Sequence, residues 1–195
     1  MRHPFRFLVD LTVGLAIACL VGFGSAALVL DRDRPFGAVT AGAWSAWPAS
    51  GSPDADPYTK AMQARSGEVP LGAGEGLIFI AEADDAGTPL SGRCSYRIVG
   101  QTPAARLWTL TAYDAEGHLM DNAVRRTSFH SREILREADG RFVIAIGPEA
   151  EPGNWLPVAT GGSFRLLLRL YDTPVGSGSD VRDLVMPRIE RGECR

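Results

Sequence analysis

The feature that most constrains this chain is an apolar segment close to its N-terminus. Leu11 to Leu30 is a run of 20 residues without a charged side chain. At about 1.5 Å per residue, a helix of this length matches the roughly 30 Å thickness of a bilayer's hydrocarbon core. The sequence therefore predicts a transmembrane helix over residues 11–30, preceded by a short segment, residues 1–10.

The charged residues on either side of this segment predict its orientation. Arg2 and Arg6 precede it, whereas the charges that follow, at residues 31–34, balance in sign. The positive-inside rule therefore places residues 1–10 in the cytoplasm and everything after Leu30 on the outer side. In a bacterium this predicts a single-pass protein of the inner membrane whose C-terminal domain lies in the periplasm.

A cleaved signal peptide is the alternative interpretation of the same segment. Arg2 and Arg6 would be its basic region, Leu11 to Phe23 its apolar region, and Ser25-Ala26-Ala27 the small residues before a cleavage site. We favour the uncleaved anchor because the apolar run continues through Leu28-Val29-Leu30, beyond that site. Both interpretations export the rest of the chain.

Export gives the cysteines their expected chemistry. Cys19 lies in the apolar segment, whereas Cys94 and Cys194 lie in the exported part. Two thiols in an oxidising compartment form a disulfide by default, and this one would close a loop of about 100 residues. We do not favour a redox role, because the sequence has no C-x-x-C arrangement.

The remaining chain predicts a linker followed by one mainly β domain. Residues 31–69 are interpreted as a linker, rich in small residues and held against the domain by Trp44 and Trp47, with one short helix. Asp56 is the expected helix cap and Gly67 the expected stop. Residues 70–195 carry apolar or alternating runs separated by Gly and Asp turns, which are typical of strands. The predicted strands are residues 77–81, 94–99, 107–113, 118–120, 142–146 and 164–171.

These elements predict a mainly β fold, an antiparallel jelly-roll-like sandwich with one or two short helices. Residues 131–136 are expected to form one helical turn, and residues 154–157 to lie in a loop. In the last strand, Arg165 and Arg169 are expected on one face and Leu166, Leu168 and Leu170 on the other.

Four motifs, in this order, resemble a known family, the domain of unknown function family 1214. They are Arg106 to Gly117 (RLWTLTAYDAEG), Asp121-Asn122, Asn154 to Pro157 (NWLP) and Leu168 to Tyr171 (LRLY). The stretches Trp47-Pro48 and Pro53 to Tyr58 are similar to the short, membrane-anchored bacterial members. The resemblance implies a jelly-roll-like sandwich and a separate partner with the companion 1254-type domain. It supplies no catalytic residues.

The net charge of −3 argues against a nucleic-acid ligand, because phosphate binding needs a basic surface. Asp114, Glu116, His118 and Asp121 lie close together in the sequence, but a hairpin turn explains them better than a metal site. We therefore expect no metal and no cofactor.

Aromatic and polar residues near the predicted loops are the best candidates for ligand binding. The candidate residues are Asn154, Trp155, Arg125, Arg169 and Tyr171. Trp can stack on a sugar ring, and Arg can bind an anion, although a loop latch or solvated strand faces would use the same residues.

No acid, base or metal ligands gather in the sequence. The leading hypothesis is therefore a non-enzymatic envelope module that binds or supports a partner protein. The alternative is a carbohydrate-binding or carbohydrate-active envelope enzyme.

Overall fold

A computed structural model describes residues 4–30, 36–67, 69–72, 74–177 and 184–195. The chain divides into two compact units. The first contains residues up to Phe36 together with Ala55–Val69, and the second contains Gly37–Asp54 together with Pro70–Arg195.

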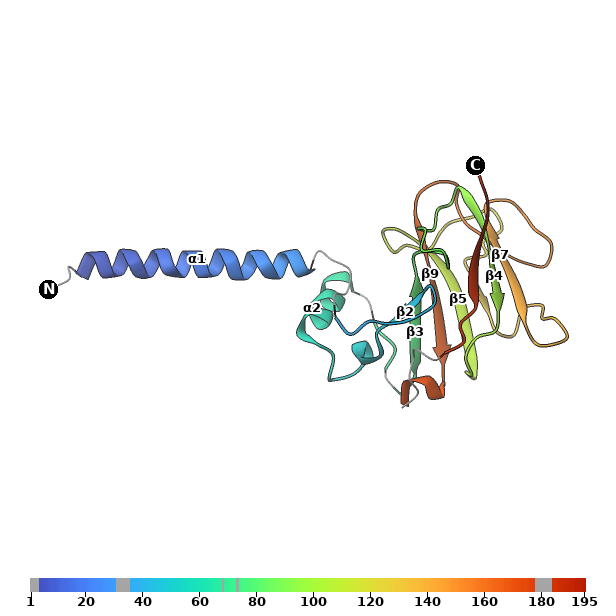
Figure 1. Ribbon diagram of the computed structural model, residues 1–195, viewed down its shortest axis with the longest axis horizontal. Coiled ribbons are helices and arrows are strands. Elements are labelled where there is room, and N and C mark those ends of the chain that lie inside the picture. Colours follow the sequence, from blue (N-terminus) through green and yellow to red (C-terminus); the bar gives the residue numbers. More distant parts are fainter. Residues whose placement is uncertain (1–3, 31–35, 68, 73, 178–183) are drawn as a thin grey trace. The chain divides into compact units, whose positions relative to one another are not determined.

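The first unit contains the apolar helix. Helix α1 spans Pro4–Leu30 and includes the whole predicted segment (Figure 1). It is long and apolar enough to cross a membrane, and within the unit its apolar side chains stay exposed, as the side chains of an anchor or of a signal sequence would. Arg2 and residues 31–34, on which the predicted orientation depends, lie outside the described residues.

The short helix of the first unit begins and ends where the sequence predicts. Helix α2 spans Pro57–Ser66, and the Asp56 carboxylate caps it by accepting hydrogen bonds from the amides of Tyr58 (2.9 Å) and Thr59 (3.0 Å). Gly67 ends the helix with φ of 70°, a conformation that glycine adopts without strain.

The second unit is built from two β-sheets. The first has six strands in the order β1-β2-β3-β9-β5-β6, all antiparallel to their neighbours (Figure 1). Its strands are β1 (Val39–Ala41), β2 (Trp44–Ala46), β3 (Gly76–Ala81), β9 (Phe164–Tyr171), β5 (Leu107–Asp114) and β6 (Ser128–His130). Two 3-10 helices, Pro48–Gly51 and Pro174–Ser177, lie outside the strands.

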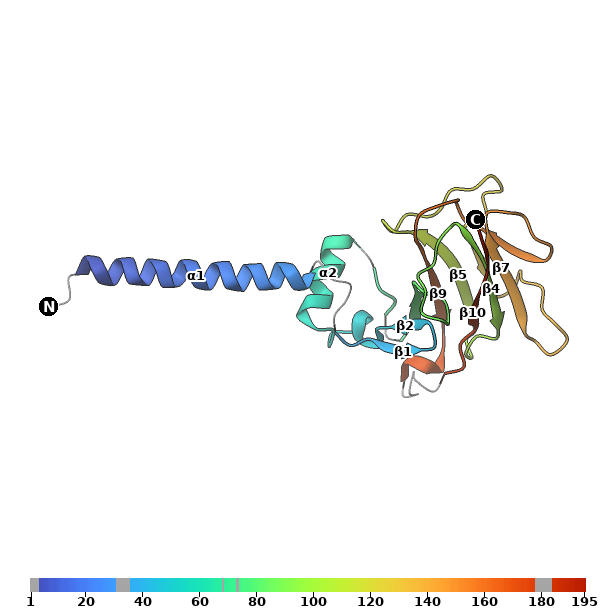
Figure 2. The same cartoon turned by 45° about the horizontal axis from the view of Figure 1, so that its top comes forward.

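The second sheet has four strands in the order β10-β4-β7-β8 (Figure 2). They are β10 (Arg188–Cys194), β4 (Cys94–Gly100), β7 (Phe142–Gly147) and β8 (Asn154–Pro157). The strands pair antiparallel, as predicted, except at one place, where β8 runs parallel to β7. Residues 154–157, predicted to be a loop, are this strand.

The two sheets bury a shared apolar core between them. Trp108 of β5 packs on Phe142 of β7 with ring centroids 5.3 Å apart, and Phe164 of β9 meets Tyr96 of β4 at 5.6 Å. Along β9, Leu166, Leu168 and Leu170 enter this core, while Arg165 and Arg169 lie on the opposite face, as predicted. The mainly β fold is confirmed, and the arrangement is compatible with a jelly roll.

Other differences from the sequence prediction occur where packing outweighs local pattern. The residues interpreted as a linker include strands β1 and β2, which bury Trp44 completely at the sheet edge. Residues 131–136 form turns rather than a helix, and residues 118–120 make only an isolated bridge, Tyr113 to Leu119.

Candidate functional site

Asn154, a predicted ligand-binding residue, is bonded within the fold. Its side chain is buried, and its Nδ2 donates to the carbonyls of Leu135 (2.8 Å) and Val143 (2.9 Å). Its Oδ1 accepts from the Leu135 amide at 2.7 Å. These three bonds fix residues 131–137 against strands β7 and β8. Asn154 thus holds a loop in place, as the latch interpretation of the sequence described it.

Trp155 and Arg125 lie at the same side of the domain as Asn154. The Trp155 Nε1 donates to the Gly147 carbonyl at 3.0 Å, and its own carbonyl accepts from Nη1 of Arg126 at 3.0 Å. Arg125 is exposed next to that contact and adopts a left-handed conformation with φ of 54°. The side chain of Arg125 is therefore exposed to solvent, whereas the indole N–H of Trp155 is hydrogen-bonded within the domain.

Arg169 and Tyr171 lie on the other sheet. Both are in β9, on its outward face, and both are partly exposed. The Arg169 Nη2 donates to the Tyr113 hydroxyl at 3.1 Å, and its guanidinium carbon lies 5.6 Å from the centre of that ring. The five predicted residues therefore form two separate groups, one beside β8 and one on β9.

The outward face of the six-stranded sheet combines apolar and cationic side chains. Ile78 and Ile80 of β3 and Leu107 of β5 remain partly exposed there. In the pairing register, Ile78 lies opposite Arg169 and Leu107 lies opposite Tyr171. These side chains, together with Arg165 and Tyr113, are called the outer sheet face below.

Arg165 is the least satisfied polar residue of that face. Its Nε is buried and has no hydrogen-bond acceptor in the part of the chain that the structure describes. Its side chain passes close to Gly117, where an added Cβ would come within 2.8 Å of Nη2, so a larger residue would displace it. Among the described residues, neither Arg165 nor Arg169 forms an ion pair with a carboxylate.

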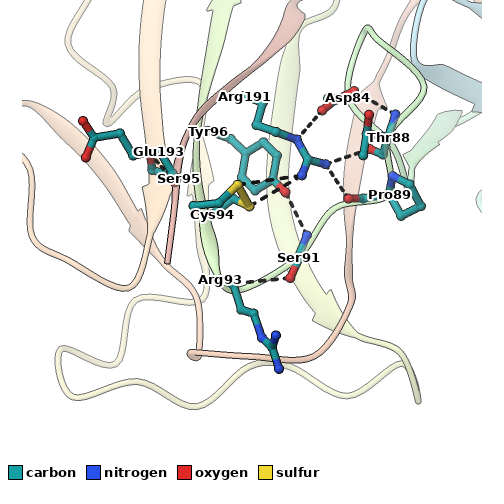
Figure 3. Close-up of a disulfide and its surroundings, with 11 residues drawn as sticks. Asp84, Thr88, Pro89, Ser91, Arg93, Cys94, Ser95, Tyr96, Arg191 and Glu193 are labelled. Carbon is teal, nitrogen blue, oxygen red and sulfur yellow. Dashed lines mark hydrogen bonds and ion pairs between the residues drawn. A yellow bond between two sulfur atoms is a disulfide. The ribbon is translucent and has the colours of Figure 1, made fainter.

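The most completely bonded polar group lies at the edge of the four-stranded sheet, around Arg191 (Figure 3). The Arg191 Nε donates to Oδ2 of Asp84 at 2.6 Å, and its Nη2 donates to the carbonyls of Thr88 (3.1 Å) and Pro89 (2.6 Å). The guanidinium also lies over the ring of Tyr96, 5.3 Å from its centre. Arg191 thereby fastens β10 to the segment between β3 and β4.

Asp84 is held in its ionised form within this group. Burial by itself raises the pKa of Asp84. The hydrogen bond and charge of Arg191, together with the amides of Thr88 and Ala86, lower the pKa by more than burial raises it. The net result is a pKa below the ordinary value for an aspartate. Its side chain is 2% exposed, so the carboxylate depends on these partners rather than on water.

The predicted disulfide between Cys94 and Cys194 is confirmed and lies against Arg191. The Arg191 Nη1 is 3.5 Å from Sγ of Cys94 and 3.9 Å from Sγ of Cys194. Cys94 is 4% exposed, whereas Cys194 is exposed.

A shallow hollow of about 220 Å³ lies beside this disulfide. Its lining consists of Arg93, Cys94, Ser95, Gly147, Pro148, Glu149, Glu151, Glu193 and Arg195. The carboxylates and arginines of this lining include an ion pair between Glu149 and Arg195.

The acidic residues around His118 form a turn. The Asp114 Oδ1 accepts from the His118 amide at 2.7 Å, and its Oδ2 lies 3.4 Å from Nδ1 of the same residue. Within the described part of the chain, no group of three or more His, Cys, Asp or Glu side chains is placed to hold a metal ion.

Sequence reasoning did not identify Asp84 and Arg191 as a pair. Asp84 lies in a turn after β3, and its amide donates across that turn to the Thr88 carbonyl at 3.0 Å. Arg191 lies 107 residues further along the chain, and nothing local indicates that the two side chains meet.

The fold and these two polar regions define a mainly β, two-sheet domain that follows an apolar N-terminal helix. The chain belongs to the family described as "Protein of unknown function (DUF1214)", which matches residues 75–175, just over half of its length. The resemblance found in the sequence motifs is thereby confirmed.

One solved structure shares the fold, and a second match is more distant. The VPA0106 protein of Vibrio parahaemolyticus is 24% identical with a TM-score of 0.58, and the match covers 72% of this chain and 36% of that one. An uncharacterized protein from Burkholderia cenocepacia is 18% identical with a TM-score of 0.44, over 92% and 52% of the two chains. This chain thus spans about a third to a half of the solved chains it matches. No curated protein matches it.

Proposed function

We propose that this chain is a membrane-anchored, non-enzymatic module of the bacterial envelope that supports a partner protein in the periplasm. The partner is a separate chain that carries the companion 1254-type domain. The outer sheet face is the proposed docking surface. The observation that carries the proposal is the combination, on this face, of partly exposed Ile78, Ile80 and Leu107 with arginines that have no carboxylate partner.

Apolar side chains on the central strands of a sheet favour burial against another surface. Each of these three side chains would gain up to about 1 kcal/mol from the removal of its remaining apolar area from water, because each is already partly buried. Isolated apolar residues on a surface are common, but Ile78 and Ile80 of β3 and Leu107 of β5 lie on either side of β9, which pairs with both strands, so they share one face of the sheet.

The arginines define the chemistry of the partner. Arg165 and Arg169 are partly exposed, and a hydrogen bond to a charged group contributes about 1.5 to 3 kcal/mol, so a carboxylate on the partner would stabilise the complex through their accessible nitrogens. The planar guanidinium pairs with carboxylates through two parallel hydrogen bonds. The partner surface is therefore expected to present apolar residues together with Asp or Glu.

The size of a solved relative supports a two-part arrangement. In the Vibrio parahaemolyticus chain, the matched part is only 36% of the protein. A domain that forms one part of a longer chain there can act in this protein with a part supplied by a separate chain.

Site-specific crosslinking in native membranes tests this proposal. A photo-reactive residue replaces Ile78 or Leu107, and the control replaces Arg97, an exposed residue of β4 on the other sheet. Crosslinks from Ile78 and Leu107, but not from Arg97, to a protein with the companion domain are expected. Equal crosslinking at all three positions, or a purified chain that alone turns over an envelope carbohydrate, would contradict the proposal.

The alternative function, carbohydrate binding, would require the predicted residues to lie together in one site. A sugar site that uses all five predicted residues would have to join Asn154 and Trp155 with Arg169 and Tyr171, which lie on different sheets. The outer sheet face keeps Arg169 and Tyr171 as proposed binding residues, now toward a protein.

A further inference from the structure

We propose that the Cys94–Cys194 disulfide is a site of thiol–disulfide exchange, at which the exposed Cys194 is attacked by a dithiol and Arg191 stabilises the departing Cys94 thiolate. This goes beyond the proposed partner-supporting function and does not depend on it. The argument rests on the unequal exposure of the two sulfurs, the position of Arg191 and the hollow beside the bond.

The two cysteines differ in how easily another molecule can reach them. Cys194 lies in the last residues of the edge strand β10 and is exposed, whereas Cys94 is 4% exposed and packed in the core. The hollow of about 220 Å³ is lined by Cys94 and by Glu193 and Arg195, the two chain neighbours of Cys194, so an incoming thiol has room beside the segment that carries Cys194. Access therefore directs attack to Cys194.

Arg191 is placed to favour the leaving group. In exchange, the sulfur that leaves does so faster when its thiolate is more stable. The Arg191 Nη1 is 3.5 Å from the Cys94 sulfur, and Asp84, Thr88 and Pro89 already fix the guanidinium there. A cation that is held in position before the reaction stabilises the new charge without having to reorganise.

The reaction balances with a dithiol as reductant. A thiolate of the dithiol bonds to Cys194 Sγ, and the Cys94–Cys194 bond breaks with its electron pair on Cys94 Sγ. The second thiolate of the dithiol then attacks the sulfur that its own molecule has attached to Cys194, which releases Cys194 as a thiolate. The dithiol is oxidised by two electrons, the domain disulfide is reduced, and the two protons of the dithiol pass to Cys94 and Cys194.

The first experiment measures the exchange equilibrium in the full chain, in detergent and on a Cys19→Ala background. The protein is equilibrated with mixtures of reduced and oxidised dithiothreitol, quenched with acid, alkylated and analysed by mass spectrometry. We expect Arg191→Met to make reduction about tenfold less favourable, which is about 30 mV. Arg191→Lys should recover part of this difference, and the control Arg97→Met should match the parent. A midpoint that does not change in folded Arg191→Met would overturn the proposal.

A second experiment does not require the Arg191 variants to fold. Cys94→Ala and Cys194→Ala each leave one of the two thiols, which is treated with oxidised glutathione. Arg191 lies near both sulfurs, 3.5 Å from Cys94 and 3.9 Å from Cys194, so the difference between the variants reports access. Cys194 in the first variant should therefore form its mixed disulfide at least about tenfold faster than Cys94 in the second. Equal rates, or faster reaction of Cys94 in a chain that retains its strand circular dichroism, would overturn the proposal.

Discussion

Two arginines on opposite sheets of the same domain have very different surroundings. Arg191 donates to a carboxylate and two carbonyls, covers an aromatic ring and lies against a disulfide. Arg165 has a buried Nε without an acceptor and no ion pair. The comparison separates polar groups whose bonds are completed within the domain from groups that another molecule can complete.

The same distinction separates the predicted binding residues. Asn154 belongs with Arg191, because all three of its side-chain hydrogen bonds are internal. Arg169 belongs with Arg165, because its hydrogen bond to Tyr113 still leaves its guanidinium partly exposed on the outer sheet face. The stability of the domain is therefore expected to depend on Asn154 and Arg191. Binding of a partner is expected to depend on Arg165 and Arg169.

Removal of the disulfide should have the largest effect on stability. Its loop of 100 residues corresponds to about 4.7 kcal/mol in the chain-entropy model. We expect Cys94→Ala with Cys194→Ala to cost about 3 to 4 kcal/mol, within the range of about 2 to 5 kcal/mol that is typical when a native disulfide is removed. Urea unfolding of the full chain, followed by tryptophan fluorescence, measures the change. Cys19→Ala is the control, and an unchanged midpoint in the double variant would contradict the expectation.

Arg191→Met should have the next largest effect. It leaves the buried Asp84 carboxylate without its cation, and breaking such a pair costs about 3 kcal/mol. Arg188→Met removes an exposed charge from the same strand and should cost less than about 0.5 kcal/mol. If both variants unfold at the same urea concentration, Arg191 does not stabilise the contact between β10 and the segment that joins β3 to β4.

Asn154→Ala should cost about 2 kcal/mol. The change leaves the Leu135 amide and the carbonyls of Leu135 and Val143 without partners, and water can reach only some of them. Hydrogen exchange should accelerate in residues 131–137, which the side chain holds. Asn122→Ala, which affects a more exposed turn, is the matched variant, and equal protection of residues 131–137 in both would contradict the latch role.

Acid should weaken the Asp84–Arg191 pair specifically. Because the folded-state pKa of Asp84 lies below its unfolded value of about 3.9, the carboxylate stabilises the fold above that pH. This contribution is lost as the pH falls through the lower folded-state pKa. The unfolding free energy of Asp84→Asn should therefore fall less steeply below about pH 4 than that of the parent chain. Parallel pH profiles would show that Asp84 titrates alike in both states.

Arg165→Gln should have the smallest effect on stability, below about 0.5 kcal/mol in either direction, because the arginine lacks internal partners. Its effect should appear instead in the crosslinking assay, as a loss of partner capture from Ile78. Arg97→Gln, which removes the same charge from the other sheet, is the control. A marked loss of stability in Arg165→Gln, with partner capture unchanged, would reverse the comparison.

Local sequence determined half of the elements in the described part of the chain and little of the site. The uncharged run predicted α1, the Asp56 cap and Gly67 stop predicted α2, and apolar or alternating runs bounded by turns predicted β3, β4, β5, β7 and β9. Alternation and length carry this information because they depend on neighbours within a few residues. Short strands such as β1, β2, β6 and β8 lack such a pattern and exist because longer strands offer them hydrogen bonds.

Cys94 and Cys194 could be paired from the sequence because they are the two cysteines that follow the apolar segment, so no knowledge of their positions in the fold was needed. That Arg191 lies against that disulfide, and that Asp84 lies under Arg191, was decided by the tertiary structure alone. The same holds for the five predicted ligand residues, which the two sheets separate. Contacts between residues about 100 positions apart depend on strand register and on how the sheets pack. A local pattern of side chains therefore does not predict which distant residues meet.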